Sequence, residues 1–170
     1  MENERVWAEN IRIESSNGFA GVVAGKAYQP GDRLLPLRGH PSDRGDRYSI
    51  QVGVDRHLKP GGSGEGDGAE ASPWKFLNHS CDPNLEVNLD EACFVARREI
   101  AKGEELSFNY LTTEWEMASP FECICGSSSC FGTIRGFKHL PREEQERLLP
   151  AAAPHIRILF ERTKVADPTA

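Results

Sequence analysis

The chain has 170 residues, of which 38% are hydrophobic and 27% charged, and its formal net charge is −6 at pH 7. This balance is typical of one globular domain with its own core and excludes a disordered chain. The acidic excess argues against direct nucleic-acid binding and favours a basic partner. No apolar run is long enough to span a membrane, and the acidic start "MENERVWAEN" lacks a secretory signal's apolar segment. We therefore expect an intracellular protein, in the nucleus or cytoplasm.

The first part of the chain is expected to form short strands. Residues 5–28 carry β-branched residues around an Asn-Gly turn signal, which predicts two strands. A third strand is predicted within 29–39, between Pro-Gly-Asp and Arg-Gly breakers. Residues 47–58 alternate apolar and polar side chains, which predicts a hairpin with Gly53 near its turn.

Strands continue into the second half, and helices come only at the end. Residues 59–73 are rich in glycine and are predicted to form a surface loop. Residues 85–110 predict at least two more strands, between which Gly103 turns the chain. Only 141–149 and 154–163 have helical patterns, each with a proline in the first turn. The fold class predicted is mostly β, α+β.

Five cysteines carry the clearest chemical signal: Cys81, Cys93, Cys123, Cys125 and Cys130. In a reducing compartment, clustered thiols indicate metal binding or catalysis rather than disulfides. The last three form C-x-C-x4-C, a spacing that suits a shared metal. The fourth ligand of a tetrahedral Zn²⁺ could be Cys81, Cys93 or a histidine.

Two of these candidates differ in their surroundings. Cys93 lies in the apolar run "EACFVA" and is interpreted as a core residue, whereas Cys81 lies in the polar stretch "NHSCDPN". We therefore predict a four-thiolate zinc site formed by Cys81, Cys123, Cys125 and Cys130. The alternative is that these cysteines are reactive or incidental. A zinc segment that binds nucleic acid is disfavoured, because no Lys or Arg lies between Cys123 and Cys130.

Three motifs in order carry a family resemblance: "NHSCDPN" at 78–84, "REIAKGEELSFNY" at 98–110, and then C-x-C-x4-C. Together they resemble the SET-domain protein lysine methyltransferases that have a post-SET zinc segment, in particular small stand-alone members without a pre-SET region. The resemblance implies a β-clip fold of small curved sheets with a pseudoknot, followed by C-terminal helices. It divides the chain into a SET domain (1–115), a post-SET segment (116–136) and a helical tail (137–170).

The resemblance also implies a reaction and its residues. Family members transfer a methyl group from S-adenosylmethionine to a lysine side chain of a protein such as a histone. Tyr110 is then the catalytic residue, and Phe108 and Leu37 line the substrate channel, with Phe108 and Tyr110 on the same side of a strand. His79 is expected to contribute backbone and packing rather than a titrating imidazole. The residues implied to bind the cofactor are Phe19, Ala20, Gly21, Tyr48, Asn78, His79, Phe131 and Ile134.

Some positions depart from the family pattern. Leu37 stands where a tyrosine is usual, Phe19 where a glycine is usual, and Asn109 where an aspartate is usual. A second hypothesis is therefore a zinc-stabilised SET-like module that binds a basic peptide without methylating it. For each cofactor residue the alternative role is core packing, and for Tyr110 it is capping a strand end. In either case we expect a monomer whose partner is a protein with an exposed lysine, with no direct contact to nucleic acid or membrane.

Overall fold

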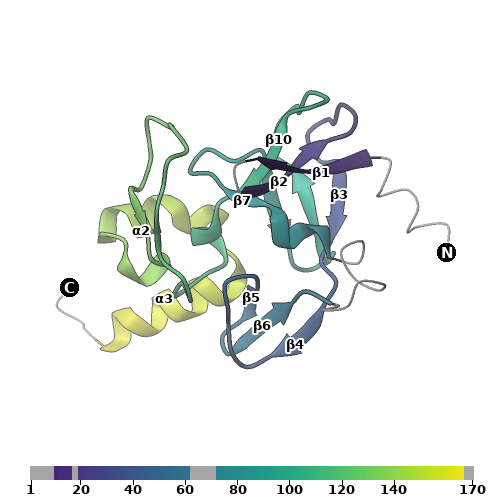
Figure 1. Cartoon of the computed structure of the whole chain (residues 1–170). Coiled ribbons are helices and arrows are strands. Elements are labelled where there is room, and N and C mark those ends of the chain that lie inside the picture. Colours follow the sequence, from purple (N-terminus) through teal and green to yellow (C-terminus); the bar gives the residue numbers. More distant parts are fainter. Residues whose placement is uncertain (1–9, 17–18, 62–71, 167–170) are drawn as a thin grey trace. The chain divides into compact units, whose positions relative to one another are not determined.

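The computed structural model describes residues 10–16, 19–61 and 72–166 (Figure 1). The chain divides into two compact units. Unit 1 comprises Met1–His40, Pro60–Asn109 and Cys125–Cys130, and unit 2 comprises Pro41–Lys59, Tyr110–Ile124 and Phe131–Ala170. Within the described ranges, none of the helices is both long and apolar enough to cross a membrane.

The larger sheet of unit 1 has four strands in the order β1-β2-β10-β7. Strands β1 (Ile11–Ser16) and β2 (Phe19–Ala24) form an antiparallel hairpin, and β10 (Glu105–Phe108) pairs antiparallel with β2. The short strand β7 (Asn78–His79) pairs with β10 in parallel. In Figure 1 the purple hairpin and the green β10 meet, so one sheet joins two parts of the sequence that lie far apart.

A second sheet of unit 1 has the order β3-β9-β8, formed by β3 (Arg33–Pro36), β9 (Cys93–Ala96) and β8 (Leu85–Asn88). A 3-10 helix, Pro73–Phe76, precedes β7. The apolar sides of these elements form the core of unit 1, which removes large aliphatic and aromatic side chains from water. Its fully buried members include Val22, Leu34, Leu35, Leu85, Phe94 and Leu106.

Unit 2 contains the hairpin of β5 (Ile50–Gly53) and β6 (Arg56–Lys59), and β4 (His40–Ser42) pairs with β6. Strands β11 (Phe121–Glu122) and β12 (Thr133–Ile134) form a second antiparallel pair. Three short 3-10 helices, Tyr110–Thr112, Phe137–His139 and Leu149–Ala151, lie between and after them.

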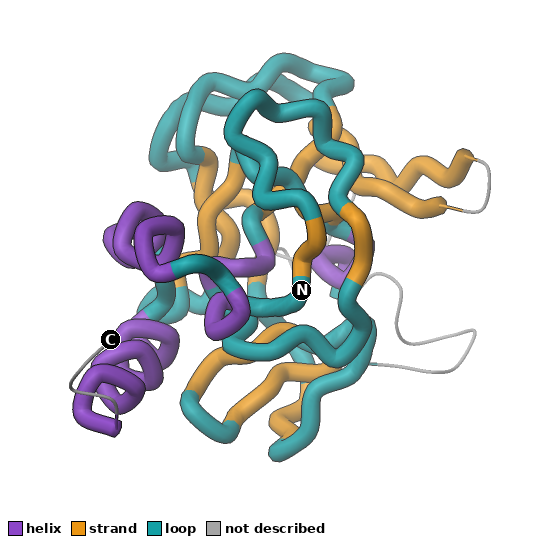
Figure 2. The backbone as a smooth tube through the Cα atoms, turned by 90° about the vertical axis from the view of Figure 1, so that its left-hand side faces the viewer, coloured by secondary structure: helices purple, strands orange, loops and turns teal. Residues whose placement is uncertain are grey.

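The helical tail of unit 2 packs on aromatic side chains. Helices α2 (Arg142–Leu148) and α3 (Pro154–Ala166) are drawn in purple in Figure 2. Phe137 and Phe160 are fully buried with their ring centroids 5.8 Å apart in an edge arrangement. The Arg142 guanidinium of α2 lies 4.3 Å from the Phe160 ring of α3, so a cation–π contact joins the two helices. The aromatic contact joins α3 to the 3-10 helix Phe137–His139.

The mostly β, α+β fold predicted from the sequence is confirmed. The hairpin within 5–28, the strand within 29–39, the hairpin around Gly53 and the two terminal helices all form. Gly103 turns the chain with a φ of 85°, a conformation that glycine adopts at little cost. The first hairpin's Asn-Gly turn and most of the glycine-rich loop at 59–73 lie outside the described residues.

Two local predictions were wrong. Pro141 is the N-cap of α2 rather than a member of its first turn. The strand expected to include both Phe108 and Tyr110 ends at Phe108, and Tyr110 opens a 3-10 helix. The carbonyl of Tyr110 accepts hydrogen bonds from the N–H groups of Thr113 (3.0 Å) and Glu114 (2.8 Å), and these bonds close a helical turn in place of a ladder.

Candidate active site and metal centre

The register of β10 sorts the motif residues onto two faces of the sheet. Side chains alternate along a strand, so Leu106 and Phe108, both buried, share one face, while Glu105 and Ser107 share the other. The parallel ladder places Asn78 opposite Ser107 and His79 opposite Phe108. The Asn-His pair of the motif therefore presents an amide on the polar face and an imidazole on the apolar face.

The amide of Asn78 is held in one orientation. Its Nδ2 donates to the carbonyl of Ala20 (3.2 Å) and to Oε1 of Glu105 (2.7 Å). Both partners only accept hydrogen bonds, so a flipped amide would place Oδ1 against two oxygen atoms. Gly21 leaves room for this pair, since a Cβ there would lie 3.2 Å from Asn78 Nδ2 and 3.1 Å from Glu105 Oε1.

Three residues predicted to bind the cofactor, Ala20, Gly21 and Asn78, are thus brought together in unit 1. Phe19 begins β2, and its side chain lies outside what the structure describes. Sequence reasoning missed Glu105, which stands two residues before Ser107 in the quoted motif. The period of two in a strand could have identified Glu105. Glu105 and Ser107 lie on the same face of β10, and Ser107 pairs with Asn78.

His79 lies in a largely buried position. Burial lowers its pKa from 6.5 to about 4, so the imidazole is neutral at physiological pH. Its Nε2 lies 3.3 Å from Sγ of Cys81. A neutral imidazole still has one N–H to donate, and a thiolate is a good acceptor for it.

Asn84, at the end of "NHSCDPN", is a structural residue that sequence reasoning missed. It is 2% exposed, its Nδ2 donates to the carbonyl of Glu105 (2.8 Å), and its Oδ1 accepts from the N–H of Ser107 (2.9 Å). The side-chain amide therefore pairs with the backbone of β10 as another strand would. It fixes the backbone that carries Glu105.

Four thiols gather at a candidate metal centre. The sulfur atoms of Cys81, Cys123, Cys125 and Cys130 all lie within 4.8 Å of one another, and those of Cys81 and Cys130 are 3.8 Å apart. A tetrahedral zinc site with Zn–S bonds of about 2.3 Å has its sulfur atoms about 3.8 Å apart. Donor type, number and spacing therefore fit zinc.

The fifth thiol is separate from this group. Cys93 lies in β9 and is 6% exposed. Burial and the neighbouring Glu91 carboxylate raise its pKa, which keeps the thiol protonated. It behaves as a small core residue, as the sequence indicated.

The two residues predicted to line the substrate channel are both in unit 1 and both mostly buried. Phe108 packs its ring edge-on against Phe94, with centroids 5.1 Å apart. Leu37 is 9% exposed, and its N–H donates to the carbonyl of Ala92 (2.7 Å) just after β3. Each is apolar, as a channel that desolvates a lysine requires.

The remaining predicted residues belong to unit 2. The Tyr110 ring contacts that of Phe121, with centroids 6.0 Å apart. Ile134 is fully buried on β12, opposite Phe121. The Arg147 guanidinium lies 5.0 Å from the Phe131 ring. Tyr48 is 51% exposed, with Arg47 5.8 Å from its ring, so it is the most accessible of these residues.

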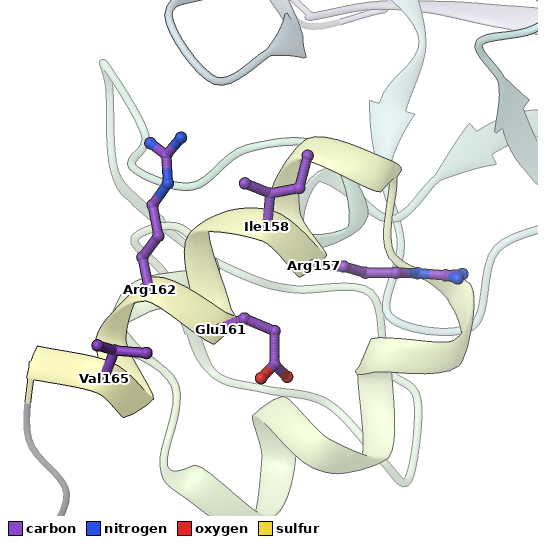
Figure 3. Close-up of a pocket in the computed structure, with 5 residues that line it drawn as sticks. All are labelled: Arg157, Ile158, Glu161, Arg162 and Val165. Carbon is purple, nitrogen blue, oxygen red and sulfur yellow. The ribbon is translucent and has the colours of Figure 1, made fainter.

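A surface hollow of about 580 Å³ lies against α3 (Figure 3). Its lining residues are Arg157, Ile158, Glu161, Arg162 and Val165. All five come from one helix, and none belongs to the motifs that carry the resemblance. Arg157 also donates to the backbone carbonyls of Ala152 and Pro150, which gives it a structural role.

Comparison with known proteins decides the family. The SET domain matches residues 19–111, more than half of the chain, from the start of β2 to the turn after β10. The chain belongs to the SET-domain family. This match contains the polar face of Asn78 and Glu105, the apolar face of His79 and Phe108, and the first of the four clustered thiols.

The curated relatives are methyltransferases by name. "Methyltransferase flvH" of Aspergillus flavus is 39% identical over 87 residues, which cover 50% of this SET chain and 48% of that protein. "Histone-lysine N-methyltransferase, H3 lysine-36 specific" of Mycosarcoma maydis is 42% identical over 69 residues, covering 36% of this chain and 7% of that one. The chain thus spans about half or less of these two relatives.

Solved structures share the SET fold. KRYPTONITE in complex with mCHG DNA and SAH superposes with a TM-score of 0.56 at 19% identity, covering 74% of this chain and 29% of that one. A second KRYPTONITE complex, with mCHH DNA, an H3(1-15) peptide and SAH, gives a TM-score of 0.52 at 20% identity over 73% of this chain. These likenesses support the β-rich α+β fold.

Proposed function

We propose that this SET-domain chain is an S-adenosylmethionine-dependent protein-lysine N-methyltransferase. The observation that carries the proposal is the match to the SET domain, together with the fixed amide of Asn78 beside Ala20 and Gly21. An amide whose two N–H groups are already used presents Oδ1 as an acceptor, which suits the ammonium of the cofactor's methionine moiety. The names of the curated relatives agree with this activity.

The chain's own residues supply binding and positioning. S-adenosylmethionine supplies the electrophilic methyl group when it is bound. A lysine amine has a pKa of about 10.4 in water and must be neutral to react, and an apolar channel favours the neutral form by desolvation. Phe108 and Leu37 provide that lining, and we assign the orienting hydroxyl to Tyr110. Such a reaction depends mainly on alignment of the amine.

The metal has a structural part in this proposal. A zinc site of Cys81, Cys123, Cys125 and Cys130 is closed, with four protein ligands, and such sites stabilise folds rather than activate substrates. The division into a SET domain (1–115), a post-SET segment (116–136) and a helical tail (137–170) belongs to the same proposal. So do the cofactor contacts assigned to Phe19, Tyr48, His79, Phe131 and Ile134.

The substrate we propose is a protein segment with an exposed lysine in a basic context, such as a histone tail. The net charge of −6 favours a basic partner. One KRYPTONITE complex holds an H3(1-15) peptide. We further propose that the protein acts as a monomer, in the nucleus or cytoplasm, without direct nucleic-acid contacts.

The competing hypothesis is a SET-like module that binds a peptide without methylating it. It rests on Leu37 and Phe19, which replace the usual tyrosine and glycine. The relatives named as methyltransferases favour the enzyme instead.

Cofactor binding by Asn78→Ala tests the proposed activity. We expect wild-type protein to bind S-adenosylmethionine in calorimetry and the variant to bind it about 1–3 kcal/mol more weakly, the range for removing one partner of a buried polar pair. Tritiated cofactor should label lysines of a histone H3 peptide or of lysate proteins with wild type. A folded wild-type protein that binds no cofactor would be evidence for the module instead.

A further inference from the structure

Glu105 stands within the motif "REIAKGEELSFNY", but the family resemblance assigns it no role. It begins β10, its side chain is exposed, and its Oε1 accepts the 2.7 Å hydrogen bond from Asn78 Nδ2. The backbone around it is held on one side by β2, where Glu105 pairs with Val23. On the other side the buried amide of Asn84 holds its carbonyl. The backbone of Glu105 is therefore held on both sides, and the Asn78 hydrogen bond is the contact that its carboxylate makes on this face.

We propose that Glu105 is a positioning residue that holds the Asn78 amide so that Oδ1 faces the ammonium of the bound cofactor. The inference rests on the proposed function. The other amide hydrogen is held by the Ala20 carbonyl at 3.2 Å, so the two acceptors together define the plane of the amide and the direction of Oδ1. Without Glu105, one acceptor remains, and the amide can rotate or flip.

The charges on this face support a cationic ligand group. Glu14 shares the face, because it pairs with Gly21, and its carboxylate is bound by Arg12 at 3.2 Å. Glu105, in contrast, makes no ion pair within the described ranges. Its negative charge therefore stands beside Asn78 without an ion-pair partner among the described residues, which favours an ammonium over a carboxylate at Oδ1.

Gly21 is part of the same arrangement. A methyl group at this position would come within 3.2 Å of both hydrogen-bonded atoms, tighter than ordinary contacts, so the pair would have to move apart. The absence of a side chain at Gly21 thus leaves space for the Glu105–Asn78 hydrogen bond.

Calorimetry with two ligands tests the inference. We expect Glu105→Ala to bind S-adenosylhomocysteine about 5- to 20-fold more weakly than wild type, as for loss of one charged hydrogen bond. Binding of 5′-methylthioadenosine, which lacks the amino-acid part, should change by less than about twofold. The double variant with Asn78→Ala should lose less than the sum of the two single losses, because Glu105 acts chiefly through Asn78. Glu86→Ala, an exposed carboxylate on β8 of the same unit, serves as the matched control and should bind like wild type.

A spectrum of the protein without cofactor gives an independent measurement. The side-chain NH₂ signals of Asn78, identified by their loss in Asn78→Ala, should be two well-separated proton resonances in wild type. In Glu105→Ala one of them should shift toward the position of an amide in water. Equal melting temperatures and zinc content show that the variants are folded.

Distinct outcomes overturn distinct claims. Unchanged S-adenosylhomocysteine binding in Glu105→Ala, equal losses for both ligands, or additive losses in the double variant overturn the inference alone. A folded wild-type protein that binds neither ligand overturns the proposed function and the inference with it.

Discussion

At the scale of single residues, the proposed roles of Phe108 and Tyr110 lead to a prediction about the number of methyl groups transferred. Phe108 ends β10 with its ring in an edge arrangement with the Phe94 ring, and Tyr110 opens the following 3-10 helix. A phenylalanine in a lysine channel offers no polar partner and leaves the space that further methyl groups need. A tyrosine there would hydrogen-bond the amine or a water molecule and fill that space.

We predict that the wild-type product goes beyond monomethyl-lysine and that Phe108→Tyr shifts it toward monomethyl-lysine. Tyr110→Phe should lose most activity at every step, since it removes the orienting hydroxyl. Mass spectrometry of a methylated peptide measures both. Each change adds or removes one oxygen, so lost packing volume does not explain different outcomes. Monomethyl product alone from wild type, or an inactive Phe108→Tyr, would contradict this prediction.

The thiols also differ residue by residue. Cys125 belongs to the four-sulfur cluster, whereas Cys93 is a buried residue of β9. We predict one zinc per chain, lost in Cys125→Ser and kept in Cys93→Ser. A serine hydroxyl stays protonated and is a poor zinc ligand beside thiolates, so loss of a single sulfur is enough.

Elemental analysis of purified protein measures this difference. Cys93→Ser is the control, because it makes the same chemical change outside the cluster. The zinc assignment fails if neither wild type nor Cys93→Ser carries the metal.

At the scale of elements, strand β5 of unit 2 is joined to the chain after the 3-10 helix Tyr110–Thr112 by a buried polar network. The N–H of Gln51 donates to Oε1 of Glu114 (2.8 Å), and the N–H of Trp115 donates to Oε1 of Gln51 (2.8 Å). Glu114 is 8% exposed, and burial raises its pKa from 4.5 to about 7. Because the pKa of this buried carboxyl differs between the folded and the unfolded chain, the free energy of unfolding depends on pH.

We predict that Glu114 lowers the stability of the fold as the pH rises from about 4.5 to about 7. In this window the folded chain keeps a proton that the unfolded chain has released, so the free energy of unfolding falls with rising pH. Glu114→Gln keeps an acceptor oxygen without the charge. It should therefore gain about 1–3 kcal/mol relative to wild type between pH 5 and pH 8.

Urea unfolding at several pH values measures the difference between the two proteins. Burial is the main cause of the lowered pKa values of His57 and His155. At low pH these histidines bind protons in the unfolded chain but not in the folded chain, so their contribution to the free energy of unfolding increases as the pH rises. Because both proteins contain these histidines, their contribution cancels in the difference. A variant-to-wild-type difference that does not change with pH would contradict the assignment to Glu114.

At the scale of the whole molecule, the net charge of −6 bears on how a substrate is recruited. A basic peptide should bind through many weak attractions that salt screens, with a screening length of about 10 Å at 0.1 M. The cofactor should instead bind through close, partly buried hydrogen bonds, which salt weakens less.

We predict that raising the salt from about 50 mM to about 300 mM lowers the affinity for a histone-tail peptide at least fivefold, while the affinity for S-adenosylhomocysteine changes less than about twofold. Fluorescence anisotropy of the peptide and calorimetry of the cofactor product measure the two. A scrambled peptide of equal charge separates sequence preference from attraction alone. Peptide affinity that does not change with salt would contradict a part for the net negative charge in peptide binding.

The sequence by itself determined what depends on local pattern. Alternation and turn residues predicted the hairpin around Gly53, and the helical patterns after Pro141 and Pro154 predicted the tail. The C-x-C-x4-C spacing selected three thiols, and the apolar surroundings of Cys93 excluded that thiol from the cluster. These features are set by neighbours along the chain, so periodicity and residue type are sufficient to predict them.

The tertiary structure alone decided contacts between distant segments. The bond from Asn78 to Glu105 spans 27 residues, and the one from Gln51 to Glu114 spans 63. The side chain of Asn84 donates a hydrogen bond to the backbone carbonyl of Glu105, which lies 21 residues later in the chain. Hydrogen-bond partners across such separations depend on the strand pairing of the folded chain, and a polar residue type does not specify its partner. The orientation of the Asn78 amide and the raised pKa of Glu114 are properties of the folded molecule for that reason.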